Sequence, residues 1–290
     1  MSDYVTILGA GAAPGVPSLS CGWGNCNPKN PKNKRLRVGT FIEYQGTKIL
    51  IDTSPDIRQQ MIDNNICSID AVFYTHAHAD HLHGIDDLRE ITRIRLNEAF
   101  QRLGSVAYSK GVYNFADLDK IENISIDCYA LKETAKVICQ SFPYLVASAR
   151  HKNKNPFYVP CFNIHKIKPN KSFYIKDVKI TPLKLLGHNI PSCGYAFNDG
   201  EIVHFSDFKQ AASSVFKQIR VRPKLLIIPL TNPYGQPSHA GFEEIMSVIN
   251  KINPQKVVIN HMATECDYDE IDSRTPDYIT PAYDGMKINL

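Results

Sequence analysis

Residues 75–81 of the chain read Thr-His-Ala-His-Ala-Asp-His, which places four potential metal ligands within six positions. Side chains two residues apart in an extended segment project to the same side, so His76 and His78 can bind one cation. Asp80 and His81 can then turn toward a second cation. A single histidine is commonly a buried core residue, but four such side chains this close together indicate a divalent-metal site.

The segments around this heptapeptide predict alternating strands and helices. The apolar residues 71–74 predict a short strand before it, and residues 85–95 predict a helix after it. Upstream, residues 40–44 and 47–51 flank Gln45-Gly46 and predict a β-hairpin. Ser54 then fits the N-cap of a helix, with Pro55 as its first residue. The heptapeptide therefore follows the end of a buried strand, where chemistry is commonly placed.

Three more ligand candidates follow predicted strands later in the chain. Residues 178–186 lead to His188, residues 202–205 to Asp207, and residues 257–259 to His261. Two cations about 3.5 to 4 Å apart can share a carboxylate, and such a pair needs more ligands than the heptapeptide supplies. The segment 97–176 is less informative. We expect a surface excursion there that shapes substrate access, with short strands, a helix over 131–140 and a polar loop over 150–156.

Length and composition predict one domain over residues 1–290, without a linker or repeat. No run of about 18 to 20 apolar residues predicts a membrane span, and no signal-peptide layout occurs, so we expect a cytoplasmic protein without membrane association. Eight scattered cysteines fit reduced thiols. The net charge of +4 favours an anionic substrate only weakly, and we expect a solvated loop for the basic run Lys29, Lys32, Lys34, Arg35 and Arg37.

The heptapeptide resembles the HxHxDH signature of the metallo-β-lactamase superfamily, and the later ligands follow that family's order over nearly the whole chain. The resemblance implies an α+β fold, a four-layer αβ/βα sandwich with the site at strand ends between two sheets. It also implies that Asp207 bridges two cations and that Asp52 orients a ligand histidine from behind. The implied ligands are His76, His78 and His188 for one cation, and Asp80, His81 and His261 for the other.

Within the superfamily the chain most resembles the phosphodiesterase branch that includes phosphoribosyl cyclic phosphate phosphodiesterase. Residues 7–17, 84–89 and 277–286 carry this likeness. It implies hydrolysis of a small cyclic phosphate or nucleotide-like diester by a metal-bridging hydroxide, with Asp80 and His239 as catalytic residues and His239 as general acid. Zinc or manganese fits the ligands, and iron is also accepted. Arg58 and Arg89 are candidate substrate contacts, and the chain is a candidate homodimer.

The chain departs from that branch at a second, structural zinc site held by three cysteines and a histidine. Cys21 and Cys26 match two of these ligands, but Trp23 and Thr264 stand where the third cysteine and the histidine would be. Cys266 is a candidate substitute, which still leaves the set short of four ligands.

Other functions remain open from the sequence. A ribonuclease Z-like tRNA 3′-processing endonuclease shares the metal site, but the chain has no clear Gly/Pro-rich basic arm or stacking platform, so nucleic acid is a less favoured partner than a small phosphodiester. A thioester hydrolase uses the same hydroxide on a carbonyl. A non-catalytic scaffold is disfavoured because all seven ligands are present. The basic residues considered for nucleic-acid contact are Lys152, Lys154, Lys166, Lys168 and Lys171.

Overall fold

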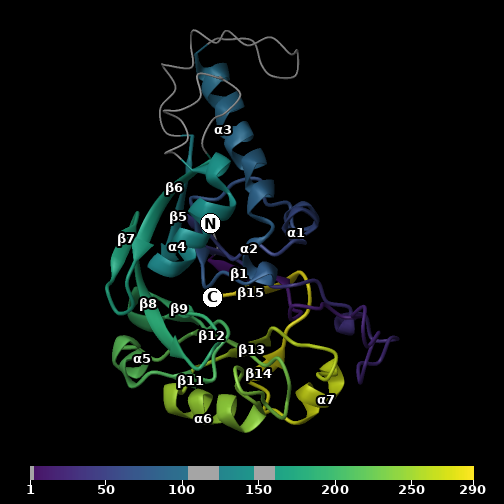
Figure 1. Cartoon of the computed structure of the whole chain (residues 1–290). Helices are drawn as coiled ribbons and strands as arrows, with labels where there is room; N and C mark the ends of the chain where they lie inside the picture. The colour runs from purple at the N-terminus through teal and green to yellow at the C-terminus, as the bar shows by residue number, and fades with distance from the viewer. Residues whose placement is uncertain (1–2, 104–123, 147–160) are drawn as a thin grey trace.

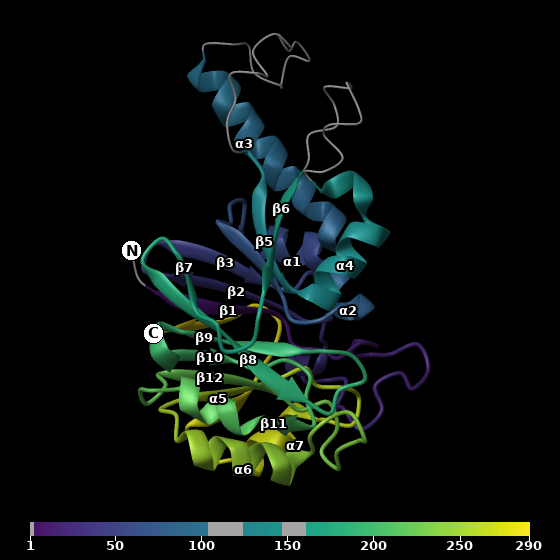
Figure 2. The same ribbon diagram turned by 60° about the vertical axis from the view of Figure 1, so that its left-hand side comes forward.

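Two β-sheets lie face to face, and helices cover the outer side of each sheet (Figure 1). These features come from a computed structural model, which describes residues 3–103, 124–146 and 161–290. The same stack is visible from the side in Figure 2, where β1, β2 and β3 lie above β9, β10 and β12. The predicted four-layer αβ/βα arrangement is confirmed.

The first sheet combines an antiparallel half and a parallel half. The strands β15, β1, β2 and β3 pair antiparallel, whereas β3, β4, β5 and β6 pair parallel. In spatial order the strands are β15 (Met286–Asn289), β1 (Tyr4–Gly9), β2 (Gly39–Tyr44), β3 (Thr47–Ile51), β4 (Ala71–Tyr74), β5 (Ile126–Leu131) and β6 (Phe162–Ile167).

The second sheet is also mixed. Its strands β10, β12, β13 and β14 pair parallel, and β11, β8, β9 and β10 pair antiparallel, with β7 (Phe173–Ile175) on β8. In spatial order they are β11 (Gln210–Ala211), β8 (Val178–Leu186), β9 (Cys193–Phe197), β10 (Ile202–His204), β12 (Leu225–Pro229), β13 (Val257–Asn260) and β14 (Ile279–Pro281).

The helices divide between the two outer layers. In both views α1, α3 and α4 lie beside the first sheet, while α5, α6 and α7 lie beside the second (Figures 1 and 2). Among the described residues, no helix combines the length and the apolar character that a membrane span requires. Within the described ranges, the α-helices are α1 (Ile57–Asp63), α2 (Ala79–Leu82), α3 (Arg89–Arg102), α4 (Lys132–Ser141), α5 (Ser213–Gln218), α6 (Phe242–Ile252) and α7 (Tyr268–Ser273), and the 3₁₀ turns are Pro31–Asn33, Ile85–Leu88, Pro143–Leu145 and Asn198–Gly200.

Successive side chains along the strands of the first sheet point to its two faces in turn, and both faces are buried. In β2, Phe41 packs with α1 and the residues after the heptapeptide, whereas its neighbour Ile42 packs toward the second sheet. In β4, Phe73 faces the second sheet and lies with its ring centroid 5.0 Å from that of Tyr195. Because successive side chains point to opposite faces, a strand buried on both faces is apolar throughout.

Most local predictions are confirmed in type, but some helix boundaries differ from the prediction. Gln45 and Gly46 both have positive φ, 49° and 69°, as the tight turn of a hairpin requires. The helix predicted from Pro55 begins instead at Ile57 with Asp56 as its N-cap. The Asp56 carboxylate accepts hydrogen bonds from the backbone N–H and the guanidinium of Arg37 at 2.6 to 2.9 Å, and this contact holds the preceding residues in a turn.

The segment 97–176 contributes more to the fold than the expected surface excursion. Its strands β5 and β6 extend the first sheet, and α4 begins one residue after the predicted helix start. The helix predicted over 85–95 is a 3₁₀ turn followed by α3, which runs on to Arg102. The polar loop predicted over 150–156, with Lys152 and Lys154, lies outside the described residues.

Candidate active site

All seven predicted ligands follow strand ends at the same edge of the sandwich. The heptapeptide continues from β4, and His78 is the N-cap of the short helix α2, so the chain turns between His78 and Asp80. In the second sheet, β8, β10 and β13 are followed by His188, Asp207 and His261. Residues more than 180 positions apart in the sequence therefore meet between the sheets.

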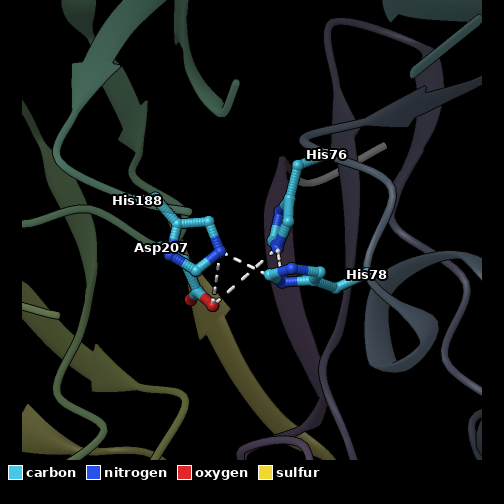
Figure 3. Close-up of side chains that lie close together, drawn as sticks. All are labelled: His76, His78, His188 and Asp207. Carbon is cyan, nitrogen blue, oxygen red and sulfur yellow. Dashed lines mark hydrogen bonds and ion pairs between the residues drawn. The ribbon is translucent and has the colours of Figure 1, made fainter. Parts of the chain in front are cut away.

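The first ligand group consists of three imidazoles and a carboxylate, shown in Figure 3. His78 Nδ1 lies 3.0 Å from His76 Nε2 and 3.0 Å from His188 Nε2. Asp207 Oδ2 lies 3.9 Å from His76 Nε2 and 4.0 Å from His188 Nε2. Ligands of a tetrahedral cation with metal–nitrogen bonds of about 2.0 to 2.1 Å are about 3.4 Å apart, so this group has the spacing of a metal site.

The second ligand group lies against the same aspartate. Asp80 Oδ2 is 3.3 Å from His81 Nε2 and 3.3 Å from His261 Nε2. Asp207 contributes Oδ1 at 3.4 Å from His261 Nε2 and Oδ2 at 3.7 Å from His81 Nε2. Because Asp207 borders both groups, it occupies the position predicted for the bridging carboxylate.

Two buried polar atoms in these ligand groups have no hydrogen-bond partner among the residues that the structure describes. They are His81 Nε2 and Asp207 Oδ1. A buried polar atom without a partner costs about 1 to 3 kcal/mol, and native proteins rarely leave one without a reason. Imidazole and carboxylate ligands suit divalent cations, so the residues present fit the metals that the resemblance implies. The described residues contain these two candidate metal groups and no other.

Asp52 supports the second group from behind. Its Oδ2 accepts a hydrogen bond from His81 Nδ1 at 2.7 Å, which leaves His81 Nε2 facing the ligand group. Asp52 Oδ1 in turn accepts from the Thr75 backbone N–H at 2.8 Å. Both Asp52 and His261 have positive φ, 61° and 56°, an uncommon backbone conformation that other contacts must hold in place.

Thr75 has an orienting role that sequence reasoning missed. Its hydroxyl donates to Asp52 Oδ2 at 2.8 Å and lies 3.0 Å from His76 Nδ1. With its proton given to Asp52, the hydroxyl can accept the Nδ1–H of His76, so His76 Nε2 is free to bind a cation. The only signal in the sequence is that Thr75 directly precedes the first ligand.

The protonation states of several site residues favour cation binding. Burial lowers the pKa of His76 well below its usual value, and the neighbouring His81 lowers it further. For Asp207, burial alone would raise the pKa, but the imidazoles of His261 and His81 hold it well below its usual value. Neutral imidazole and ionised carboxylate are the forms that bind metal. His81 differs, because Asp52 and Asp80 outweigh burial and raise its pKa, so a cation would displace a proton there.

A pocket of about 320 Å³ opens beside the ligands, and His239 lines it. His239 Nδ1 lies 3.2 Å from the Thr231 hydroxyl and 3.9 Å from Asp207 Oδ2. Burial is the largest of the effects that lower the pKa of His239. His239 therefore lies next to the candidate metal site, as predicted. The other polar residues that line the pocket are Ser18, Ser20, Cys21, His78, Asp80, Asp207, Thr231, Gln236, His261, Thr264 and Glu265.

Neither predicted arginine reaches this pocket. Arg58 is exposed on α1, and Arg89 lies 3.7 Å from Asp86 at the start of α3. No lysine or arginine is among the described residues that line the pocket. The N-terminal basic run is only in part the solvated loop expected for it. Lys29 and Lys34 are exposed, but Arg35 is buried and Arg37 pairs with Asp56 at 2.6 Å.

The three cysteines considered for a structural zinc do not form a metal group. Cys21 is exposed, whereas Cys26 and Cys266 are buried and donate to backbone carbonyls. Arg35 lies between these segments. Its guanidinium donates to the Cys266 carbonyl at 2.8 Å and contacts Cys26 Sγ at 3.8 Å. A buried guanidinium therefore joins the loop after β1 to the turn before α7, where the resemblance implied a metal.

Comparison with known proteins agrees with this geometry. The model of the family described as the beta-lactamase superfamily domain matches residues 47–125 and 112–262 of the chain. The chain belongs to the metallo-β-lactamase superfamily. Enzymes with this fold are generally hydrolases, and the family binds divalent metals at a site of the kind found here.

Two curated relatives match this superfamily member over different lengths. An octanoyltransferase of Porphyromonas gingivalis is 29% identical over 287 residues, which are 97% of this chain and 50% of that protein. A ribonuclease Z of Methanopyrus kandleri is 29% identical over 94 residues, 32% of this chain and 34% of that protein. The chain spans half the length or less of these relatives.

A solved structure resembles the whole chain. It is a diphosphatase of the PhnP family, with a TM-score of 0.78 and 25% sequence identity, and the match covers 100% of this chain and 98% of that one. The similarity agrees with the phosphodiesterase branch that residues 7–17, 84–89 and 277–286 indicated.

Proposed function

We propose that the chain is a binuclear metal-dependent phosphodiesterase that cleaves small cyclic phosphate or nucleotide-like diesters. The observation that carries the proposal is the position of Asp207, which borders both ligand groups while His239 lies 3.9 Å from its carboxylate. The similarity to a PhnP-family diphosphatase supports chemistry at phosphorus.

Zinc or manganese would bind at the two groups, with iron as a third candidate. When bound, such cations lower the pKa of a water toward neutrality and so supply a nucleophile, and they offset charge on the phosphoryl oxygens. Asp80, His81 and His261 would hold the second cation, and Asp207 would be shared between the two. His76, His78 and His188 would hold the first.

In this proposal His239 acts as general acid. The bond from phosphorus to the incoming oxygen forms while the bond to the leaving oxygen breaks, and His239 Nε2–H gives its proton to that leaving oxygen. A residue in this role must line the space where substrate binds, which His239 does. Substrate orientation would rest on hydroxyl and amide groups of the pocket, because its described lining residues include no cation.

A second candidate is hydrolysis of an acyl thioester. The observation in its favour is that nearly the whole chain resembles half of a protein named octanoyltransferase. The same nucleophile can attack a carbonyl, and a thiolate leaves more readily than an alkoxide. A substrate with little negative charge would also suit a pocket without lysine or arginine among its described residues.

The proposal is tested with metal-free protein reconstituted separately with zinc and with manganese. Four substrates are compared: bis(p-nitrophenyl) phosphate, a cyclic ribose phosphate, a precursor tRNA and an octanoyl thioester. His78→Ala is the matched control, because it lacks one ligand of the first group.

Metal-dependent cleavage of the two diesters, absent in His78→Ala, is the expected result. Cleavage of the thioester alone would replace the proposal with the second candidate. Specific cleavage of precursor tRNA would replace it with the ribonuclease Z-like reading. Nucleic-acid contacts would then be sought at Lys166, Lys168 and Lys171.

A further inference from the structure

The Thr231 hydroxyl lies between two histidines that have different tasks in the proposed reaction. Its Oγ1 is 3.0 Å from Nδ1 of His261, a predicted ligand, and 3.2 Å from Nδ1 of His239, the predicted general acid. Both distances lie at or near the usual range for hydrogen bonds. Thr231 follows β12 by two residues and was not singled out by its sequence position.

The contact with His261 Nδ1 determines which hydrogen bonds the Thr231 hydroxyl can still make. His261 Nε2 faces Asp80 Oδ2 at 3.3 Å and Asp207 Oδ1 at 3.4 Å, so Nε2 is the atom that would bind a cation. A histidine that binds metal through Nε2 carries its proton on Nδ1 and donates it to a neighbouring acceptor. Thr231 Oγ1 is that acceptor, and one lone pair and one proton of the hydroxyl remain for His239.

A hydroxyl can keep the contact with His239 in both charge states. When His239 is protonated, Nδ1–H donates to Thr231 Oγ1. When Nδ1 of neutral His239 lacks its proton, the Thr231 O–H rotates and donates to it. Among the described residues, Nε2 of His239 has no hydrogen-bond partner, and His239 lines the pocket. Nε2 is therefore the nitrogen left for the leaving oxygen.

The backbone on either side does not set the direction of the His239 ring. The turn containing His239 is closed by backbone hydrogen bonds to Gln236, and Lys209 Nζ contacts the His239 carbonyl at 3.4 Å. These contacts hold the main chain but leave the rotation of the side chain free. The hydrogen bond between the Thr231 hydroxyl and the His239 side chain orients the ring.

We propose that Thr231 is a positioning residue that ties His239 to the ligand His261 and aims His239 Nε2 at the leaving oxygen. The inference rests on the proposed phosphodiesterase function for its kinetic consequence, but not for the hydrogen bond itself. Loss of the hydroxyl should lower turnover most for substrates whose leaving oxygen needs a proton. Turnover should change little for substrates whose leaving group departs as a stable anion.

The test compares zinc-loaded wild-type protein with Thr231→Val, Thr231→Ser and Thr47→Val. Thr231→Val keeps the side-chain shape and removes the hydroxyl, while Thr231→Ser keeps the hydroxyl. Thr47→Val is the matched control, because the buried Thr47 hydroxyl has no hydrogen-bond partner in the described part of the chain. Turnover is measured on bis(p-nitrophenyl) phosphate, whose leaving group departs unprotonated, and on a cyclic ribose phosphate, whose leaving alkoxide needs a proton.

Thr231→Val should lower kcat on the cyclic phosphate by about 10- to 100-fold, a part of what general acid catalysis supplies. Because Thr231 also accepts the His261 Nδ1–H, Thr231→Val should bind zinc more weakly, so all variants are compared at saturating zinc. There its turnover of bis(p-nitrophenyl) phosphate should fall much less than its turnover of the cyclic phosphate. Thr231→Ser should restore the lost rate, and Thr47→Val should behave as wild type. An equal loss on both substrates, or no loss on either, would overturn the proposal.

A second measurement does not depend on turnover. Long-range ¹H–¹⁵N spectra of the histidine rings, with His239 assigned by its absence in His239→Ala, report the hydrogen bond at Nδ1. The Nδ1 resonance of His239 should shift in Thr231→Val and return in Thr231→Ser. An unshifted resonance in Thr231→Val would overturn the positioning role. If wild-type protein cleaves neither diester, the phosphodiesterase function fails and this spectrum alone decides the role of Thr231.

Discussion

At the residue scale, the two ligand groups meet at the carboxylate of Asp207, which has ligand atoms of one group on each side. Asp207 Oδ2 faces the first group and Oδ1 faces His261 of the second, so one side chain can bridge two cations. The histidines around it are oriented by contacts on their other nitrogens, with Asp52 behind His81 and Thr231 behind His261. Such outer contacts fix which nitrogen is free to bind a cation.

The first residue-scale prediction concerns His239. Replacement with alanine should lower turnover of a cyclic phosphate by about 100- to 10,000-fold, the usual contribution of a positioned acid. Bound metal should be retained, because His239 belongs to neither ligand group. Steady-state kinetics together with metal analysis check this. If His239→Ala cleaved every substrate at the wild-type rate, the assignment of a general acid would be wrong.

A second residue-scale prediction concerns Asp52. Asp52→Asn weakens the acceptor of the His81 Nδ1–H and the support for Thr75, so metal affinity should fall by about 10- to 100-fold. Competition with a chelator of known affinity measures this. Equal zinc affinity in the variant and in wild-type protein would remove Asp52 from the metal site's support.

The seven candidate ligands could be predicted because the heptapeptide is a local signal and because the later residues follow the order of the family that the chain resembles. Four of them share one heptapeptide, and the others each follow a predicted strand. Thr75, Thr231 and Arg35 could not be predicted, because a hydroxyl or guanidinium acquires its role only from partners distant in the sequence. Arg58 and Arg89 are not among the described residues that line the pocket, and a helix pattern does not say which surface faces the pocket.

At the element scale, close contact between loops sets the position of the heptapeptide. The loop after β3 and the end of α2 are joined by hydrogen bonds from Thr53 N to the His81 carbonyl and from Gly84 N to the Thr53 carbonyl, at 2.7 and 2.9 Å. A Cβ on Gly84 would lie 2.0 Å from the Ser54 carbonyl oxygen. Only glycine therefore allows the two segments to approach this closely.

Asp284 performs a similar joining role between β14 and β15. Its carboxylate accepts from the backbone N–H groups of Ala10 and Leu36 at 2.8 and 2.7 Å, which links the C-terminal turn to both ends of the loop after β1. Burial nevertheless raises the pKa of Asp284 to about 6. Between about pH 4 and 6 the folded state thus binds more protons than the unfolded state, so stability falls as pH rises through this range.

The element-scale prediction concerns how the contribution of Asp284 to stability depends on pH. The wild-type free energy of unfolding, measured relative to Asp284→Asn, should be largest below about pH 4 and should decrease by on the order of 3 kcal/mol as pH rises past about 6. Urea denaturation of metal-free protein at several pH values measures the difference. A difference that stays constant over this range would contradict the raised pKa.

Element boundaries were harder to predict than element types. The hairpin over 40–51 and the strands before His188 and His261 appear where the patterns placed them. The helix expected from Pro55 begins two residues later because Asp56 is engaged by Arg37, a tertiary contact that a local capping pattern cannot include. In the segment 97–176, short strands were expected but their bounds were not, because β5 carries partly buried polar residues between apolar ones.

At the scale of the whole molecule, the fold brings two halves of the chain together at one edge. The first sheet supplies the heptapeptide and the second supplies His188, Asp207 and His261, so each ligand group contains residues from both sheets. A core that packs Phe73 of one sheet against Tyr195 of the other lies directly behind the site. Metal binding would therefore also hold the two sheets together at this edge.

The most direct test of the account is a titration of metal-free protein with zinc, following bis(p-nitrophenyl) phosphate turnover and bound zinc together. We predict that turnover rises as two zinc ions bind per chain, and that His78→Ala shows neither full binding nor turnover. Turnover that persists in chelated protein, or zinc binding no greater than that of His78→Ala, would contradict the binuclear site.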